Sequence, residues 1–140
     1  MLFGKLERVI KRIVIVEDEP LVAFDNEHFL RSAGYEVIAT VDTVPDAIAS
    51  ITSETDLVLA DLNLSDGGNG RDVAAIARER GVPLVFVTGA KPENACCQAI
   101  GLLSKPYSQR DLLDTIGTVE AVLSGRKAKR VPRGFTLFSQ

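Results

Sequence analysis

Four short segments of the chain carry side chains that could act together on phosphorus. They are the acidic residues 17–19, the carboxylate of Asp61, the hydroxyl of Thr88 and the ammonium of Lys105, and each closely follows a run of apolar residues. Crowded carboxylates repel one another and need a cation, and oxygen ligands of this kind suit Mg²⁺. A carboxylate beside such an ion, with a lysine and a hydroxyl near it, is equipped for nucleophilic attack on a phosphoryl group.

Each of these segments also has an ordinary structural interpretation when it is taken alone. The acids at 17–19 precede Pro20 and could cap a helix and complement its dipole. Asp61 could be a turn residue, Thr88 a helix cap and Lys105 a solvated surface charge. The chemical interpretation therefore depends on whether the fold brings the four segments to one place.

Alternating apolar and amphipathic stretches predict the elements that would position these groups. Strands are expected at residues 12–16, 35–41, 56–60, 83–87 and 100–103, and helices at about 20–33, 44–51, 71–80, 92–99 and 108–123. Five strands alternating with five helices indicate an α/β fold with a doubly wound parallel sheet covered on both faces. In such sheets ligands bind outside the carboxyl ends of the strands, where all four segments lie.

The residues at these strand ends resemble a known family. The motifs are Val-Glu-Asp-Glu at 16–19, Asp-Leu-Asn-Leu at 61–64, Phe-Val-Thr-Gly at 86–89 and Ser-Lys-Pro-Tyr at 104–107. In this order and spacing the chain resembles the receiver domains of two-component response regulators over about residues 11–123. The resemblance implies a flavodoxin-like (βα)5 fold with strand order 2-1-3-4-5.

The resemblance also implies a role for each polar residue of the motifs. Asp61 resembles the phosphoacceptor, and Asp18 with Asp61 resembles the side-chain ligands of Mg²⁺. Glu17 completes the acidic pair with Asp18, and its longer arm suits a metal contact through water. Asn63 is expected to offer its backbone carbonyl to the same ion.

Two further residues resemble the parts that bind and sense the phosphoryl group. Thr88 resembles the switch hydroxyl, and Lys105 resembles the phosphate-binding lysine. The resemblance also implies a cis peptide bond before Pro106.

Two departures from the usual receiver pattern affect this interpretation. Leu102 stands where the family usually has a Tyr or Phe ring that turns inward on activation, and Glu17 replaces the commoner Asp. Together with the Thr88-Gly89 pair, Leu102 makes the chain similar to the FAT GUY receivers of alphaproteobacterial stress signalling, although Val87 and Ala90 match that motif imperfectly. A switch through the segment from Thr88 to residue 99 is expected in place of the ring movement.

Charge and composition limit the remaining possibilities. Residues 125–140 hold five basic residues and no acid, and with these set aside the chain has 11 basic and 19 acidic residues, a net charge of −8. An acidic body of this kind argues against a DNA-binding domain. No apolar run is long enough to cross a bilayer and no signal peptide is recognisable. The two cysteines, Cys96 and Cys97, are adjacent and fit a reducing cytosol.

The chain is therefore expected to have three parts: an amphipathic extension at 1–10, a receiver domain at 11–123 and a basic tail at 124–140. The extension has an apolar stripe that could pack against the tail residues Phe135, Leu137 and Phe138, or form a homodimer contact. The tail is expected to be too short and too basic to hold a core.

The functional prediction is a stand-alone, cytoplasmic response regulator of a two-component phosphorelay. A histidine kinase or a phosphotransfer protein would phosphorylate Asp61, and the phosphoryl group would control binding to an unknown protein partner. No enzymatic activity is expected beyond autocatalytic phosphorylation and dephosphorylation. One alternative is a binding module that needs no phosphorylation. Another is a haloacid dehalogenase-like phosphatase, which would need a second acid where Asn63 stands and a cap over the site.

Overall fold

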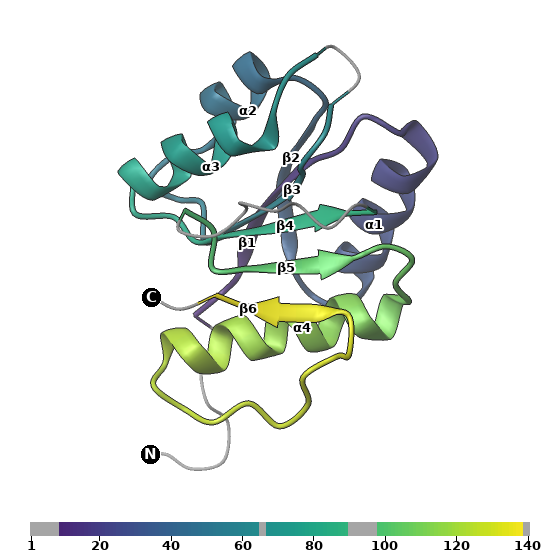
Figure 1. The fold of residues 1–140 in the computed structure, drawn as a ribbon, viewed down its shortest axis with the longest axis vertical. Helices are drawn as coiled ribbons and strands as arrows, with labels where there is room; N and C mark the ends of the chain where they lie inside the picture. The colour runs from purple at the N-terminus through teal and green to yellow at the C-terminus, as the bar shows by residue number, and fades with distance from the viewer. Residues whose placement is uncertain (1–8, 65–66, 90–97, 139–140) are drawn as a thin grey trace.

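The computed structural model describes residues 9–64, 67–89 and 98–138, and its centre is one sheet (Figure 1). The strands are β1 (Arg12–Val16), β2 (Glu36–Val41), β3 (Leu57–Asp61), β4 (Leu84–Thr88), β5 (Gly101–Ser104) and β6 (Phe135–Leu137). The helices are α1 (Pro20–Ser32), α2 (Val44–Ser50), α3 (Gly70–Glu79) and α4 (Gln109–Leu123). The strand order is β2-β1-β3-β4-β5-β6, which confirms the predicted doubly wound sheet and its order 2-1-3-4-5.

The central strands are apolar throughout because both faces of the sheet are covered. All five residues of β3 and all five of β4 are buried. Helices α2 and α3 pack on one face, in a cluster that includes Val14, Val58 and Phe86. Helices α1 and α4 pack on the other face, where the alternate residues Ile13 and Leu59 point. Because both faces of these strands are buried, their sequences are continuous runs rich in β-branched residues and leucine.

The pairing of the strands brings their carboxyl ends to one edge. Strand β1 pairs with both β2 and β3 in parallel, so the chain reverses its direction of winding between β1 and β3. Asp61 at the end of β3 is level with Val87 in β4, and Thr88 at the end of β4 is level with Ser104 in β5. The ends of β1, β3, β4 and β5 therefore surround the point where open α/β sheets bind their ligands.

Helix starts follow from local capping. The side chain of Asn69 accepts a hydrogen bond from the amide of Arg71 at the start of α3. Ser108 and Asp111 form a reciprocal capping box at the start of α4. Pro20 occupies the first turn of α1, where its missing amide donor costs no helical hydrogen bond. These caps satisfy backbone groups at the helix starts that follow β1, β3 and β5.

The last strand was not predicted from the sequence. The expected five-stranded sheet gains β6, which pairs with β5 in the antiparallel direction, with Leu103 level with Phe135 and Gly101 level with Leu137. The basic tail is therefore partly structured, and Phe135 is buried. This strand is hard to recognise from the sequence because only three residues form it and basic residues precede them.

Several predictions concern residues outside the described ranges. The expected helix at 92–99 falls mostly on residues 90–97, and most of the amphipathic extension falls on residues 1–8. The described end of that extension packs onto the receiver: Ile10 is fully buried, and its amide donates a hydrogen bond to Oε1 of Glu120 in α4 at 2.8 Å. Within the part of the chain that the structure describes, no helix is long and apolar enough to cross a membrane.

Candidate functional site

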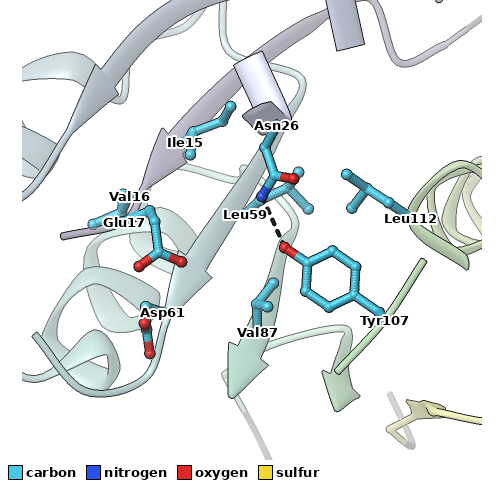
Figure 2. Close-up of a pocket in the computed structure, with 9 residues that line it drawn as sticks. All are labelled: Ile15, Val16, Glu17, Asn26, Leu59, Asp61, Val87, Tyr107 and Leu112. Atoms are coloured by element: carbon cyan, nitrogen blue, oxygen red, sulfur yellow. Dashed lines mark hydrogen bonds between the residues drawn. The ribbon is translucent and has the colours of Figure 1, made fainter. Parts of the chain in front are cut away.

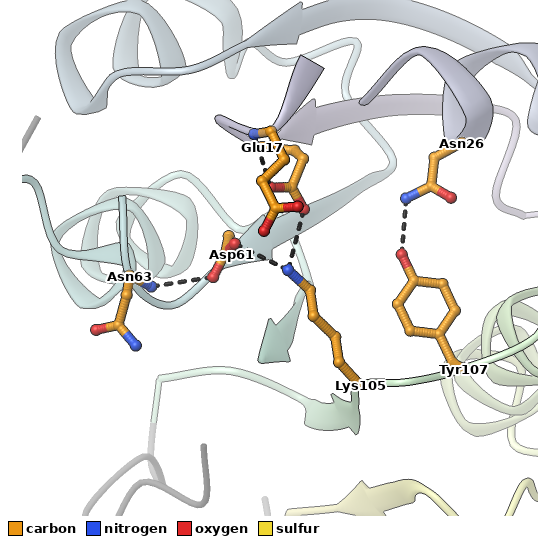
Figure 3. Close-up of polar contacts among 7 residues, drawn as sticks. Glu17, Asn26, Asp61, Asn63, Lys105 and Tyr107 are labelled. Atoms are coloured by element: carbon orange, nitrogen blue, oxygen red, sulfur yellow. Dashed lines mark hydrogen bonds and ion pairs between the residues drawn. The ribbon is translucent and has the colours of Figure 1, made fainter. Parts of the chain in front are cut away.

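Three of the predicted site residues form one ion-pair network at the carboxyl edge of the sheet (Figure 3). The ammonium Nζ of Lys105 lies 3.1 Å from Oδ2 of Asp61 and 3.4 Å from Oε1 of Glu17. Glu17 follows β1, Asp61 ends β3 and Lys105 follows β5, so residues up to 88 positions apart meet here. The convergence predicted from the strand ends is therefore present in the fold.

The carboxylates of Glu17, Asp18 and Asp61 are grouped as a hard metal ion would require. One oxygen of each carboxylate lies within 4.8 Å of the others. Glu17 is only 5% exposed and Asp61 is 8% exposed, so water screens their mutual repulsion poorly. A cluster of oxygen ligands with little screening and one ammonium beside it fits Mg²⁺, and the donor set contains no soft ligand.

An open cavity of about 480 Å³ lies beside this cluster. Its lining residues are Asp18, Glu19, Asp61, Asn63, Leu64, Thr88 and Gly89. Thr88 is buried, with an exposed fraction of 2%, and it ends β4 on the same edge as the acids. The cavity thus has carboxylates and a hydroxyl on its walls and room for a phosphoryl group.

Burial and charge shift the pKa values of two of these groups. Burial raises the pKa of Glu17 above its ordinary value, and the negative charge of Asp61 adds to this effect against the opposing influence of Lys105. For Lys105, burial lowers the pKa, but the hydrogen bond to Asp61 and the two nearby carboxylates outweigh it and leave the pKa raised. Lys105 is therefore cationic at neutral pH and offsets the charge of the two carboxylates beside it.

The backbone around Asp61 is fixed by a close approach that only glycine allows. A Cβ atom at Gly70 would lie 2.8 Å from Cα of Leu62 and closer still to the backbone oxygen of Asp61. The amide of Gly70 donates to the backbone oxygen of Leu62 at 2.8 Å, and the amide of Asn63 donates to Oδ1 of Asp61 at 3.1 Å. Gly70 at the start of α3 thus holds the backbone after Asp61, a role that the sequence alone did not reveal, and the amide of Asn63 holds the carboxylate.

A second polar contact supports the loop that carries Lys105. The side-chain amide of Asn26 in α1 donates a hydrogen bond to the hydroxyl of Tyr107 at 2.8 Å (Figures 2 and 3). Both residues line a cavity of about 10 Å³, enough for one water molecule, which also touches Glu17 and Asp61. The predicted cis peptide bond before Pro106 is present, between Lys105 and Pro106. Tyr107 was part of a recognised motif, but nothing in the sequence pointed to Asn26.

Comparison with known proteins identifies the family. The model of the response regulator receiver domain matches residues 13–117, which is well over half of the chain. The chain therefore belongs to the response regulator receiver family. This assignment, together with Asn63 in place of a second acid, favours a receiver over a haloacid dehalogenase-like phosphatase.

The relatives that match include the phyllosphere-induced regulator PhyR. PhyR of Methylorubrum extorquens is 33% identical over 129 residues, which cover 84% of this chain and 46% of that protein. The crystal structure of PhyR from Brucella abortus is 30% identical, with a TM-score of 0.67, over 84% of this chain and 50% of that one. These similarities agree with the resemblance to the alphaproteobacterial receiver group.

A further solved structure matches across nearly its whole length. The CheY-like receiver domain protein of Methanospirillum hungatei is 28% identical, with a TM-score of 0.72, over 83% of this chain and 98% of that one. In contrast, the chain spans about half the length of the curated relatives that it matches. The similarity thus covers the receiver part of those regulators.

Proposed function

We propose that this receiver is switched by Mg²⁺-dependent phosphorylation of Asp61 and that the phosphoryl group controls binding to a protein partner. The observation that carries the proposal is the 3.1 Å contact between Nζ of Lys105 and Oδ2 of Asp61 beside two further carboxylates. The phosphoryl donor would be a histidine kinase or a phosphotransfer protein, as in the receiver family. The cytoplasm is the proposed location, and no catalytic activity is proposed beyond autocatalytic phosphorylation and dephosphorylation.

In the proposed transfer, an oxygen of Asp61 attacks the donor phosphorus. The P–O bond to Asp61 forms as the P–N bond to the donor imidazole breaks, and the imidazole leaves with the electron pair of that bond. Lys105, which contacts Asp61 in the structure, would neutralise charge on the phosphoryl oxygens. The hydroxyl of Thr88 would donate a hydrogen bond to one of these oxygens. The product is an aspartyl phosphate, with roughly −1.5 to −2 charge as for other phosphorylated side chains.

The proposed metal ligands are the side chains of Asp18 and Asp61 and the backbone carbonyl of Asn63, with Glu17 in a supporting position. When bound, Mg²⁺ supplies positive charge that offsets the phosphoryl and carboxylate oxygens. A cation here would also favour the ionised form of Glu17, whose pKa burial otherwise raises. EDTA is therefore expected to abolish phosphorylation, and Asp18→Ala to weaken it.

The proposed switch differs from the usual ring movement. Residue 102 in β5 is a leucine, so there is no aromatic ring at this position to move inward. Leu102 is already 6% exposed and packs in the same apolar cluster as Phe86. The signal would instead pass from Thr88 and Gly89 into the segment that follows them. New charge-assisted hydrogen bonds to the phosphoryl oxygens would supply the free energy that favours the active form.

Incubation with acetyl phosphate and Mg²⁺, followed by intact mass measurement, tests the proposal. The wild-type chain should gain about 80 Da, the mass expected for one phosphoryl group, and Asp61→Ala should gain nothing. Asp42→Ala, which removes an exposed carboxylate after β2, is the matched control and should be phosphorylated normally. A phosphorylated Asp61→Ala variant would overturn the proposed acceptor, and a chain that never gains the mass would favour the phosphorylation-independent binding module.

A further inference from the structure

The connection between α4 and β6 carries a cluster of positive charge. Residues 124–134, which we call the strap, include the exposed side chains of Arg126, Lys127, Lys129 and Arg130. Among the residues that the structure describes, none of these four side chains has a hydrogen-bond or ion-pair partner. Four uncompensated cations in a chain that is otherwise strongly acidic need an explanation.

The strap is held against α4 by specific contacts. Gly125, with φ of +69°, turns the chain back at the end of the helix, and the amide of Arg126 then donates to the backbone oxygen of Ala121 at 2.7 Å. The hydroxyl of Thr118, buried in α4, is shared between the backbone oxygens of Asp114 at 2.8 Å and Arg130 at 3.0 Å. Pairing of β6 with β5 fixes the far end of the strap (Figure 1). The cations are therefore presented in a defined place and are not part of a free tail.

A groove of about 450 Å³ lies between the strap and the outer face of α4. The four strap cations line it, and α4 contributes Arg110, Leu113, Asp114, Gly117, Glu120 and Ala121. Both acids already have partners: Asp114 pairs with Arg110 at 3.4 Å, and Glu120 accepts the amide of Ile10 at 2.8 Å. With Arg110 counted, five cations and two acids line the groove, so its net charge is positive.

We propose that this groove binds an acidic segment of a partner protein. Four cations fixed along a groove attract carboxylates, and the apolar Leu113 offers contact to an adjacent apolar side chain. A nucleic acid fits less well, because its continuous phosphates would also meet Asp114, Glu120 and a body with a net charge of −8. A short acidic peptide places its charge only where the strap provides the opposite sign.

The composition of α4 supports this assignment. Gly117 lies in the middle of the helix, where glycine is unfavourable, and a Cβ atom built there would have no heavy atom of the described residues within 4 Å. Within the part of the chain that the structure describes, no tight packing on Gly117 explains its presence, and its missing side chain keeps the groove open. The binding proposed here does not involve Asp61, so it stands or falls independently of phosphorylation.

Fluorescence anisotropy with the full, unphosphorylated chain tests the proposal. The probes are a short labelled peptide rich in Asp, Glu and Leu, the same peptide with Asn and Gln in place of the acids, and a single-stranded RNA of similar length. The acidic peptide should bind at least about tenfold more tightly than the neutral one, and its affinity should fall as salt is raised. The double variant Lys127→Ala/Lys129→Ala should lose about tenfold in affinity for the acidic peptide.

Two further variants separate docking from general effects of charge and stability. Arg71→Ala/Arg78→Ala removes the same charge from α3, on the other face of the sheet, and should bind the peptide nearly as well as the wild type. Gly117→Gln fills the groove without removing charge, and should weaken peptide binding while leaving the melting temperature unchanged or higher. Equal loss in the α3 variant, equal affinity for the neutral peptide, tighter strap-dependent binding of RNA, or strap-dependent self-association in place of peptide binding would each overturn the proposal.

Discussion

The contact between Gly101 in β5 and Phe135 in β6 allows a quantitative test of how the last strand is attached. A Cβ atom at Gly101 would lie 2.5 Å and 2.6 Å from two carbons of the Phe135 ring and 2.6 Å from the backbone oxygen of Thr136. Gly101→Ala should therefore overpack the strand pair and cost about 1–3 kcal/mol of unfolding free energy. Phe135 is 6% exposed, and Phe135→Ala should cost about 3 kcal/mol through lost burial and the cavity left behind.

The double variant separates this contact from general loss of stability. Phe135→Ala removes the ring contact but leaves the contact of the new methyl group with the backbone oxygen of Thr136. The two single losses should therefore exceed the loss of the Gly101→Ala/Phe135→Ala double variant by about 1 kcal/mol. Urea unfolding followed by circular dichroism measures all four free energies, provided that the transition is two-state. Gly117→Ala is the control and should stabilise the chain by up to about 1 kcal/mol. Losses that add to within about 0.5 kcal/mol would refute the ring contact.

Three other predictions follow from the site. Gly70→Ala should slow phosphorylation by acetyl phosphate about tenfold or more and destabilise the chain, because its Cβ atom would press on the backbone after β3; intact mass and urea unfolding measure both. Burial raises the pKa of Tyr107 above its ordinary value of 10.0, and absorbance should show this in a Tyr35→Phe variant, in which Tyr107 is the one tyrosine left. The ionisation of Tyr107 therefore contributes stability that is complete below pH 10.0 and is lost as the pH rises through the pKa of the folded state. Beryllofluoride should change amide hydrogen exchange most over residues 88–99 and little around Leu102, and an unchanged 88–99 segment would contradict the proposed switch.

The sequence predicted the sheet and the site because both depend on patterns that are local. Continuous apolar runs identify strands buried on both faces, and the parallel connections then force the ends of β1, β3, β4 and β5 together. Asp61 and Lys105 could therefore be placed side by side without coordinates, although 44 positions separate them.

The features that the sequence missed depend on contacts between distant segments. Strand β6 has only three residues, and its stability rests on Phe135 packing over Gly101, a fit that no periodicity reveals. The tie between Asn26 and Tyr107 joins positions 81 apart, and the role of Gly70 follows from its approach to the backbone of Asp61. Each of these is visible only when the packed neighbours are known.

Borohydride trapping tests the central claim most directly. Borohydride reduces an aspartyl phosphate to homoserine, so the phosphorylated residue can be read by peptide mass spectrometry after treatment with acetyl phosphate and Mg²⁺. We expect homoserine at position 61 only when both the phosphodonor and Mg²⁺ are present, and a greatly reduced yield in Lys105→Met, because that variant lacks the ammonium 3.1 Å from Asp61. Homoserine at another position, or conversion that persists in EDTA, would contradict the account.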